Sequence, residues 1–117
     1  MNDEIFKAMS EKELQSTVME IMRWQGWKTY HVYDSRRSEP GYPDVTAVKG
    51  SRLMFVEFKT EAGKIKASQI EWLDALVEAH DEVYLVRPSS MDEFLKDVGV
   101  SGDDLSCHWR NVRMPRD

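Results

Sequence analysis

Cysteine is nearly absent from this sequence, which has Cys107 as its one cysteine in 117 residues. A single cysteine excludes an internal disulfide and a zinc site made of cysteines, and it gives no sign of an oxidising compartment. As a nucleophile, Cys107 would need a positioned base. The adjacent His108 is poorly placed for that role, because the side chains of neighbouring residues usually point apart.

Long apolar runs are also missing. No stretch approaches the roughly 18 apolar residues of a membrane-spanning helix, and residues 1–13 lack the basic and apolar regions of a signal peptide. The chain contains no internal repeat, low-complexity stretch or interdomain linker. We therefore expect a cytoplasmic protein with a single domain over residues 1–117.

Positive charge is scarce overall, since the formal net charge is −5. That balance argues against a nucleic-acid partner, because phosphate contacts need Lys and Arg. The distribution of charge points the other way: residues 21–70 hold nine basic and five acidic residues, a net charge of +4, so the remainder carries −9. The middle of the chain is thus a candidate nucleic-acid-binding region, although mild charge asymmetry is common in other proteins.

The stretch over residues 41–59 predicts a β-hairpin, with its turn at residues 49–51. Asp44 stands at the start of the first strand and Glu57 near the end of the second, with Lys59 two positions later. Because strand side chains alternate between faces, Glu57 and Lys59 project on the same side. Two carboxylates and a lysine therefore converge at one sheet edge, where they could hold Mg²⁺ for phosphodiester cleavage.

The alternative for this hairpin is a charged solvent face, because an E-x-K triplet is a common pattern. The strand over residues 53–58 is the most apolar in the chain, however, and an exposed face would carry more polar residues than two at its far end. That context favours the interpretation as a site.

A helix is predicted over residues 10–25, with Ser10 and Glu13 as a capping box and Gly26 as its stop. Glu11 falls within its apolar stripe, which consists of Leu14, Val18, Ile21 and Met22. As a first-turn acid, Glu11 either points to water and favours the helix dipole, or reaches the hairpin as a third carboxylate.

The segments on either side of the hairpin carry basic residues. After a predicted strand over residues 27–33, a polar loop brings Arg36 and Arg37 directly before the candidate site, where they are placed either to hold phosphates or to face solvent. After the hairpin, residues 60–66 form a loop with Lys64 and Lys66. These four residues are the candidate DNA-binding cations.

The remaining pattern predicts a mixed sheet. A helix over residues 67–80 carries Gln69 in its first turn, where the amide is either a surface group or a contact to a metal-bound water or phosphate. A strand over residues 82–87 then runs parallel to the strand over 53–58, because strand, crossover helix and strand are joined in that way. Residues 88–90 are a break, and a short helix over 91–98 is predicted with Ser90 and Glu93 as a second capping box.

Taken in order, these motifs resemble the VRR-NUC branch of the PD-(D/E)XK nuclease superfamily. The resemblance rests on Glu11 and Gln15, then Gly41-Tyr42-Pro43-Asp44, Val56-Glu57-Phe58-Lys59, Gly63, Ser68-Gln69 and Val86-Arg87. It implies a domain core over about 10–87, followed by a C-terminal extension over 88–117. It implies an α/β fold of the restriction-endonuclease type, with an α-β-β-β-α-β core in which helices flank a mixed sheet. It also implies a stand-alone nuclease of a phage or bacterium, acting in the host cytoplasm.

The resemblance also implies roles for particular residues. Asp44 and Glu57 would bind Mg²⁺ or Mn²⁺ together with the backbone carbonyl of Phe58, and Glu11 would bind directly or through water. Lys59 would orient or deprotonate the attacking water and offset phosphate charge, and Gln69 would support that geometry. For Lys59 we favour electrostatic and positioning roles, because the adjacent carboxylates retain its positive charge.

The function expected from the resemblance is a structure-specific DNA endonuclease, with four-way junctions as its favoured substrate. A homodimer follows from such a substrate, since a two-fold protein matches a two-fold junction. The alternatives are a non-catalytic DNA-binding or regulatory module that kept the fold, and a small structural protein with a surface charge cluster.

Overall fold

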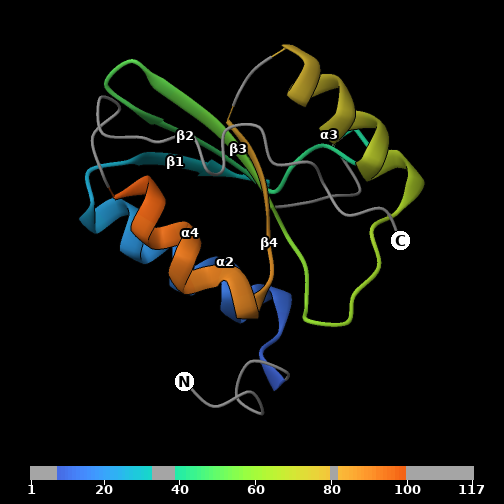
Figure 1. Cartoon of the computed structure of the whole chain (residues 1–117), viewed down its shortest axis with the longest axis horizontal. Helices are drawn as coiled ribbons and strands as arrows, with labels where there is room; N and C mark the ends of the chain where they lie inside the picture. Colours follow the sequence, from blue (N-terminus) through green and yellow to red (C-terminus); the bar gives the residue numbers. More distant parts are fainter. Residues whose placement is uncertain (1–7, 33–38, 80–81, 100–117) are drawn as a thin grey trace.

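A computed structural model describes residues 8–32, 39–79 and 82–99 of the chain. Within these residues, four strands form one mixed sheet in the order β1-β2-β3-β4 (Figure 1). The strands β1 (Lys28–His31), β2 (Val45–Lys49) and β3 (Arg52–Phe58) pair antiparallel in succession, and β4 (Val83–Val86) lies parallel to β3. The α/β class with a mixed sheet and flanking helices, expected from the sequence, is confirmed.

The first long helix, α2 (Glu11–Trp24), begins where its capping box predicts. The Ser10 hydroxyl accepts the N–H of Glu13 at 3.0 Å, and the Glu13 carboxylate accepts the N–H of Ser10 at 3.1 Å. These two bonds satisfy backbone donors that a helix start leaves without partners. Gly26, with φ +98°, ends the helix in a conformation that glycine adopts at little cost.

The hairpin closes at Gly50, which has φ +61°, and its register pairs Lys49 with Arg52 and Val45 with Val56. From β3 the chain crosses over through α3 (Ala67–Ala79) and returns as β4, with Phe58 paired to Val86. Both the hairpin and the parallel return are confirmed predictions.

Two apolar layers hold the sheet between its helices. One face of the sheet packs against α2 and α4 (Met91–Val98), and the other packs against α3 (Figure 1). Along β4 the side chains alternate, with Tyr84 and Val86 in the first layer and Val83 and Leu85 in the second. This alternation is the two-residue period of a strand that is covered on both faces. Glu57 follows Val56 of the first layer, so it lies on the α3 face of β3.

The segment before α4 differs from its prediction. Residues Pro88–Ser90 form a short 3₁₀ helix, η2, instead of a break. The Ser90 hydroxyl accepts the N–H of Arg87 at 3.0 Å and makes no capping bond to α4, so the predicted second capping box is wrong. A serine can serve only nearby backbone groups, and here it serves the turn that precedes it.

Some predictions lie outside the described residues. These include the end of the strand predicted over 27–33, and Cys107 and His108 in the C-terminal extension. Among the helices that the structure describes, none has the length and apolar character needed to cross a membrane.

Candidate functional site

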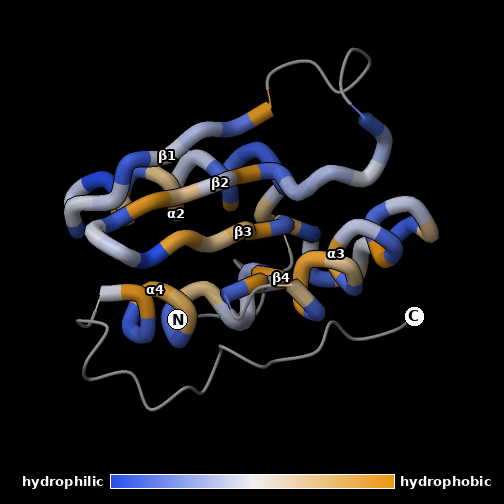
Figure 2. The backbone as a smooth tube through the Cα atoms, turned by 90° about the horizontal axis from the view of Figure 1, so that it is seen from above, coloured by the Kyte–Doolittle hydropathy of each residue, from blue (hydrophilic) through white to orange (hydrophobic). Residues whose placement is uncertain are grey.

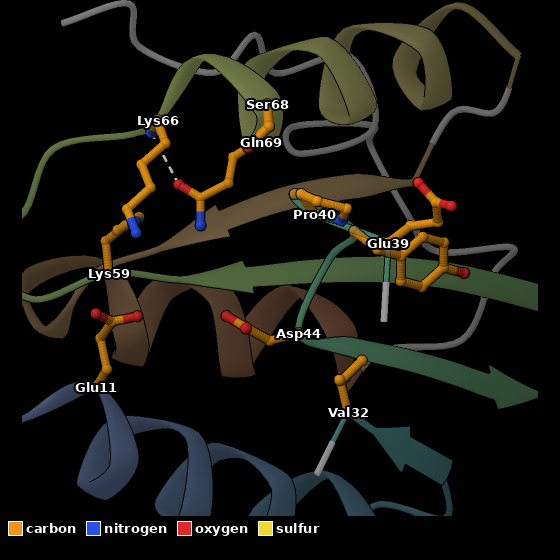
Figure 3. Close-up of a pocket in the computed structure, with 11 residues that line it drawn as sticks. Glu11, Val32, Glu39, Pro40, Asp44, Lys59, Lys66, Ser68 and Gln69 are labelled. Carbon is orange, nitrogen blue, oxygen red and sulfur yellow. Dashed lines mark hydrogen bonds between the residues drawn. The ribbon is translucent and has the colours of Figure 1, made fainter. Parts of the chain in front are cut away.

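A pocket with a volume of about 410 Å³ opens where α2 begins, β3 ends and α3 begins (Figure 3). Helices on opposite faces of the sheet contribute to it: Glu11 enters from α2 and Gln69 from α3, with Asp44 between them. The pocket is lined by Glu11, Val32, Glu39, Pro40, Gly41, Tyr42, Asp44, Lys59, Lys66, Ser68 and Gln69. Residues far apart in the sequence thus meet around the carboxylates of the hairpin.

Backbone and side-chain hydrogen bonds fix the two hairpin carboxylates. The N–H of Phe58 donates to Asp44 Oδ2 at 2.8 Å, which ties Asp44 to the end of β3. Gln69 Nε2 donates to Glu57 Oε2 at 2.9 Å, while Gln69 Oε1 accepts the N–H of Lys66 at 2.8 Å. Gln69 is thus held at both ends of its amide, and it orients Glu57 from the first turn of α3.

Glu57 is the most buried acid of the site, with 1% of its surface exposed. Its Oε1 is buried and has no hydrogen-bond partner among the residues that the structure describes. Burial, and then the negative charge of Asp44, raise the pKa of Glu57 to about 9. Burial also raises the pKa of Asp44. Without a divalent ion, burial and the repulsion between the two carboxylates therefore favour a proton on the pair, and a divalent ion would favour its ionised form.

These residues fit a hard divalent cation. Mg²⁺ is bound in proteins by one or two carboxylates, completed by carbonyl oxygen, water and substrate phosphate. The buried Oε1 of Glu57, beside Asp44, is an oxygen ligand that such an ion would bind. Within residues 8–32, 39–79 and 82–99 no three His, Cys, Asp or Glu side chains gather as a metal cage. The residues therefore fit an ion whose remaining ligands are a backbone carbonyl, water and substrate phosphate.

The structure places Lys59 and Glu11 at this pocket in different environments. Lys59 is 5% exposed, and its backbone N–H donates to the Val86 carbonyl at 3.1 Å, which fixes the chain just beyond β3. Glu11 is exposed, so burial within the apolar stripe of α2 is not observed. It nevertheless lines the pocket, and its carboxylate points toward Lys59 and Asp44 in Figure 3.

The four predicted DNA-binding cations divide into three groups. Lys66 is exposed and lines the pocket. Lys64 is exposed in the same loop and does not line it. Arg36 and Arg37 lie outside the described residues, so their placement stays a prediction.

Comparison with known proteins identifies the family. The VRR-NUC domain family matches residues 4–89. This chain belongs to the VRR-NUC domain family. The members of this family are nucleases. A solved structure described as a VRR_NUC domain has the same fold, with a TM-score of 0.63 and 22% identity over 76% of this chain and 97% of that one. A search of the curated proteins found no match.

In this VRR-NUC domain, Arg87 has a role that the sequence did not reveal. Its Nη1 donates to the carbonyls of Thr60 at 2.8 Å and Gly63 at 2.7 Å, with a longer bond of 3.3 Å to that of Glu61. The arginine thereby holds the loop that connects Lys59 to Lys66. Its place in the Val-Arg motif was the one available signal, because a sequence does not show which backbone carbonyls an arginine will contact.

Gly41 brings the Gly-Tyr-Pro-Asp segment of the VRR-NUC domain against α3. It has φ +89°, and a Cβ added there would lie 2.2 Å from the carbonyl oxygen of Ser68. Next to it, the ring of Tyr42 meets Trp72 edge to face, with 5.0 Å between ring centroids. A side chain at position 41 would push Asp44 and Gln69 apart, which accounts for glycine at this point of the motif.

Proposed function

We propose that this VRR-NUC domain is a Mg²⁺- or Mn²⁺-dependent deoxyribonuclease that cuts branched DNA, such as four-way junctions. The observation that carries the proposal is the buried, unpartnered Oε1 of Glu57 beside Asp44. Buried polar atoms in proteins almost always have a partner, and exceptions point to an ion or a catalytic role. Membership of a nuclease family supports the reaction class.

The proposed site divides its work among this chain's own residues. Asp44, Glu57 and the backbone carbonyl of Phe58 would hold the ion, and Glu11 would bind it directly or through water. When bound, the divalent ion supplies a Lewis acid and lowers the pKa of a bound water. Gln69 keeps Glu57 in its orientation through the 2.9 Å hydrogen bond.

Lys59 acts on the substrate in this proposal. Hydrolysis forms one P–O bond from water and breaks another, and negative charge builds up on the phosphate oxygens in between. The ammonium of Lys59, buried at the pocket wall, orients the attacking water and stabilises that charge. The candidate DNA-binding cations would contact phosphates on either side of the one that is cleaved. They are Lys64, Lys66, Arg36 and Arg37.

The substrate and the assembly are linked. A fold this small has little surface for reading a base sequence, so DNA structure is the feature that it recognises. Symmetric cleavage of a four-way junction needs two active sites, and a homodimer supplies them through two-fold symmetry.

The test is cleavage of synthetic four-way junction, flap and linear DNA with Mg²⁺, with Mn²⁺ and with EDTA. Wild type should cut branched DNA only when the metal is present, and Asp44→Asn and Lys59→Ala should not cut. Glu93→Gln, which changes an exposed acid on α4, is the matched control and should cut like wild type. Equal cutting by Asp44→Asn would remove the assigned site. DNA binding without cleavage in any condition would instead identify a non-catalytic DNA-binding module.

A further inference from the structure

The edge strand β1 presents an exposed aromatic residue on the face of the sheet that carries the site. Thr29 Oγ1 accepts from Arg23 Nε of α2 at 3.0 Å, so Thr29 faces α2. Because strand side chains alternate, Lys28, Tyr30 and Val32 face the opposite side, as Asp44 and Glu57 do. The side chain of Tyr30 is 64% exposed there.

This open face continues onto β2. Lys28 pairs with Val48 and Tyr30 with Thr46, so these four side chains share one surface. Val48 is 42% exposed, which is unusual for valine in a strand. Of the described helices, α3 is the one on this side of the sheet, and it lies beside β4, so no described helix covers β1 and β2 (Figure 2).

The same face runs directly into the pocket. Val32 lines the pocket, and its N–H donates to the carbonyl of Asp44 at 3.2 Å. Residues two apart in a strand are about 7 Å apart. The face therefore leads from the pocket wall to Tyr30 after about 7 Å and to Lys28 after about 14 Å.

Charge along this face is favourable for a phosphate chain. Among the described positions of β1 and β2 on this side, the ionisable groups are Tyr30 and Lys28, and no carboxylate precedes Asp44 at the pocket. An exposed aromatic ring followed by a cation is the combination that binds single-stranded nucleic acid, with a base stacked on the ring and a phosphate beside the cation.

We propose that an unpaired DNA strand leaves the pocket along β1, with one base stacked on Tyr30 and a phosphate held by Lys28. The inference rests on the proposed function for its direction, since DNA occupies the pocket. At about 3.4 Å per stacked nucleotide, the 14 Å path holds up to about four nucleotides. The favoured substrate is thus branched DNA with a short unpaired arm.

The test is binding measured by fluorescence anisotropy in EDTA, where the proposed cleavage does not occur. Two labelled branched DNAs are compared, one with a four-nucleotide unpaired arm and one with that arm paired. Tyr30→Ala should bind the unpaired form about 10-fold more weakly, at the lower end of the range for losing one stacked base. Tyr30→Phe should stay within about twofold of wild type, because the ring is kept.

Matched controls come from the opposite face of the sheet. Trp24, 85% exposed at the end of α2, and Lys96, exposed on α4, lie away from this path. Trp24→Ala and Lys96→Gln should bind like wild type. Lys28→Gln should reduce the slope of log affinity against log salt by about 0.7, which corresponds to one lost phosphate contact on a single strand.

Failure of this inference is separable from failure of the nuclease. Unchanged binding by Tyr30→Ala, or an equal loss with Trp24→Ala, would overturn the path along β1, even if Asp44-dependent cleavage is observed. Tyr30-dependent binding in a protein that never cleaves would support the path and reject the nuclease. If Tyr30→Ala binds DNA normally and loses a dimer in a mass measurement, the face is a contact between copies, and the path is wrong.

Discussion

Two buried glutamates at opposite ends of the sheet show the difference between a structural and a reactive carboxylate. Glu82, 6% exposed just before β4, accepts hydrogen bonds from Arg52 at 3.1 and 2.6 Å and from the Tyr84 hydroxyl at 2.8 Å. Glu57, 1% exposed in β3, accepts a hydrogen bond from the neutral amide of Gln69 on Oε2, and its buried Oε1 has no hydrogen-bond partner among the described residues. The two carboxylates are therefore buried to a similar degree, but Glu82 has a full set of hydrogen bonds and Glu57 does not.

The comparison teaches where the fold has left a place for a cation. A buried carboxylate is stable only when a charge and hydrogen bonds compensate for lost water. At Glu82 the compensation is supplied by Arg52, which also lies over the ring of Trp27 at 4.9 Å. At Glu57 burial and the negative charge of Asp44 outweigh the favourable charge of Lys59 and the backbone hydrogen bond from Asp44, so the carboxylate is only partly compensated. A bound cation would complete the compensation.

The strongest test of this contrast is Glu57→Gln. It should lower metal-dependent DNA cleavage by about 10³-fold, because one ligand of the proposed ion is lost. Single-turnover cleavage at saturating protein is the measurement. The control, Glu71→Gln, changes an exposed acid of α3 and should cleave normally. Cleavage by Glu57→Gln at the wild-type rate would place the chemistry elsewhere.

At Glu82 we expect the opposite result, a loss of stability with an unchanged cleavage rate. Arg52→Met should lower the free energy of unfolding by about 3 kcal/mol, because it leaves Glu82 buried without its cation. Urea unfolding gives the value, and Lys12→Met, an exposed change on α2, serves as the reference. The folded fraction should keep its cleavage rate per molecule. A loss below about 0.5 kcal/mol would show that the Arg52–Glu82 pair is not structural.

The pH dependence of stability should follow Glu57 and Asp44. Both pKa values are raised in the folded protein, so the folded state holds protons more tightly than the unfolded chain. Their contribution to stability is complete below about pH 4.5 and is lost as the pH rises toward about 9. Metal-free protein should lose at least about 1.4 kcal/mol across this window, since that is the value of one pKa unit.

Melting curves in EDTA between pH 5 and pH 9 measure this loss. Mn²⁺ should reverse it, because the ion binds the ionised pair. Glu57→Gln should flatten the curve, since its amide does not titrate. A wild-type curve that stays flat would contradict the proposed proton on the pair.

A smaller effect is expected from the loop behind the site. Arg87→Met should reduce cleavage about 3- to 10-fold, because the carbonyls of Thr60 and Gly63 lose their donor and the loop from Lys59 to Lys66 loosens. The metal affinity, measured by calorimetry, should change less than twofold if Arg87 only positions this loop. A loss of metal affinity equal to that of Glu57→Gln would give Arg87 a part in the ion site.

The elements of this fold were predictable where local rules decide. The capping box of Ser10 and Glu13 placed the start of α2, and the turn at Gly50 placed the hairpin, because both involve residues within a few positions of one another. The same rule failed at Ser90, whose hydroxyl had two competing backbone partners. Sequence alone does not rank such partners, since their distances depend on the surrounding chain.

The candidate site was predictable as a set of residues but not as an arrangement. The alternation of β3 put Glu57 and Lys59 on one side, and the ordered motifs indicated Asp44, Glu11 and Gln69. The sequence left open whether Glu11 points to water or reaches the hairpin. What was missed is how the other residues are held: the two hydrogen bonds of the Gln69 amide to Glu57 and Lys66, and the contacts of Arg87. The bond from Gln69 to Glu57 and the contacts of Arg87 join elements that approach only after the sheet and helices have packed.

By itself, the sequence determined the hairpin that carries Asp44 and Glu57, because turn chemistry, capping and two-residue alternation act over a few positions. Tertiary structure alone decided which buried glutamate would find hydrogen-bond donors and a cation to compensate its charge. Arg52 and Tyr84 reach Glu82 across neighbouring strands, whereas Glu57 Oε1 is enclosed without a donor. The physical reason is that desolvation and compensation depend on what surrounds an atom in three dimensions, and the order of residues does not specify those surroundings.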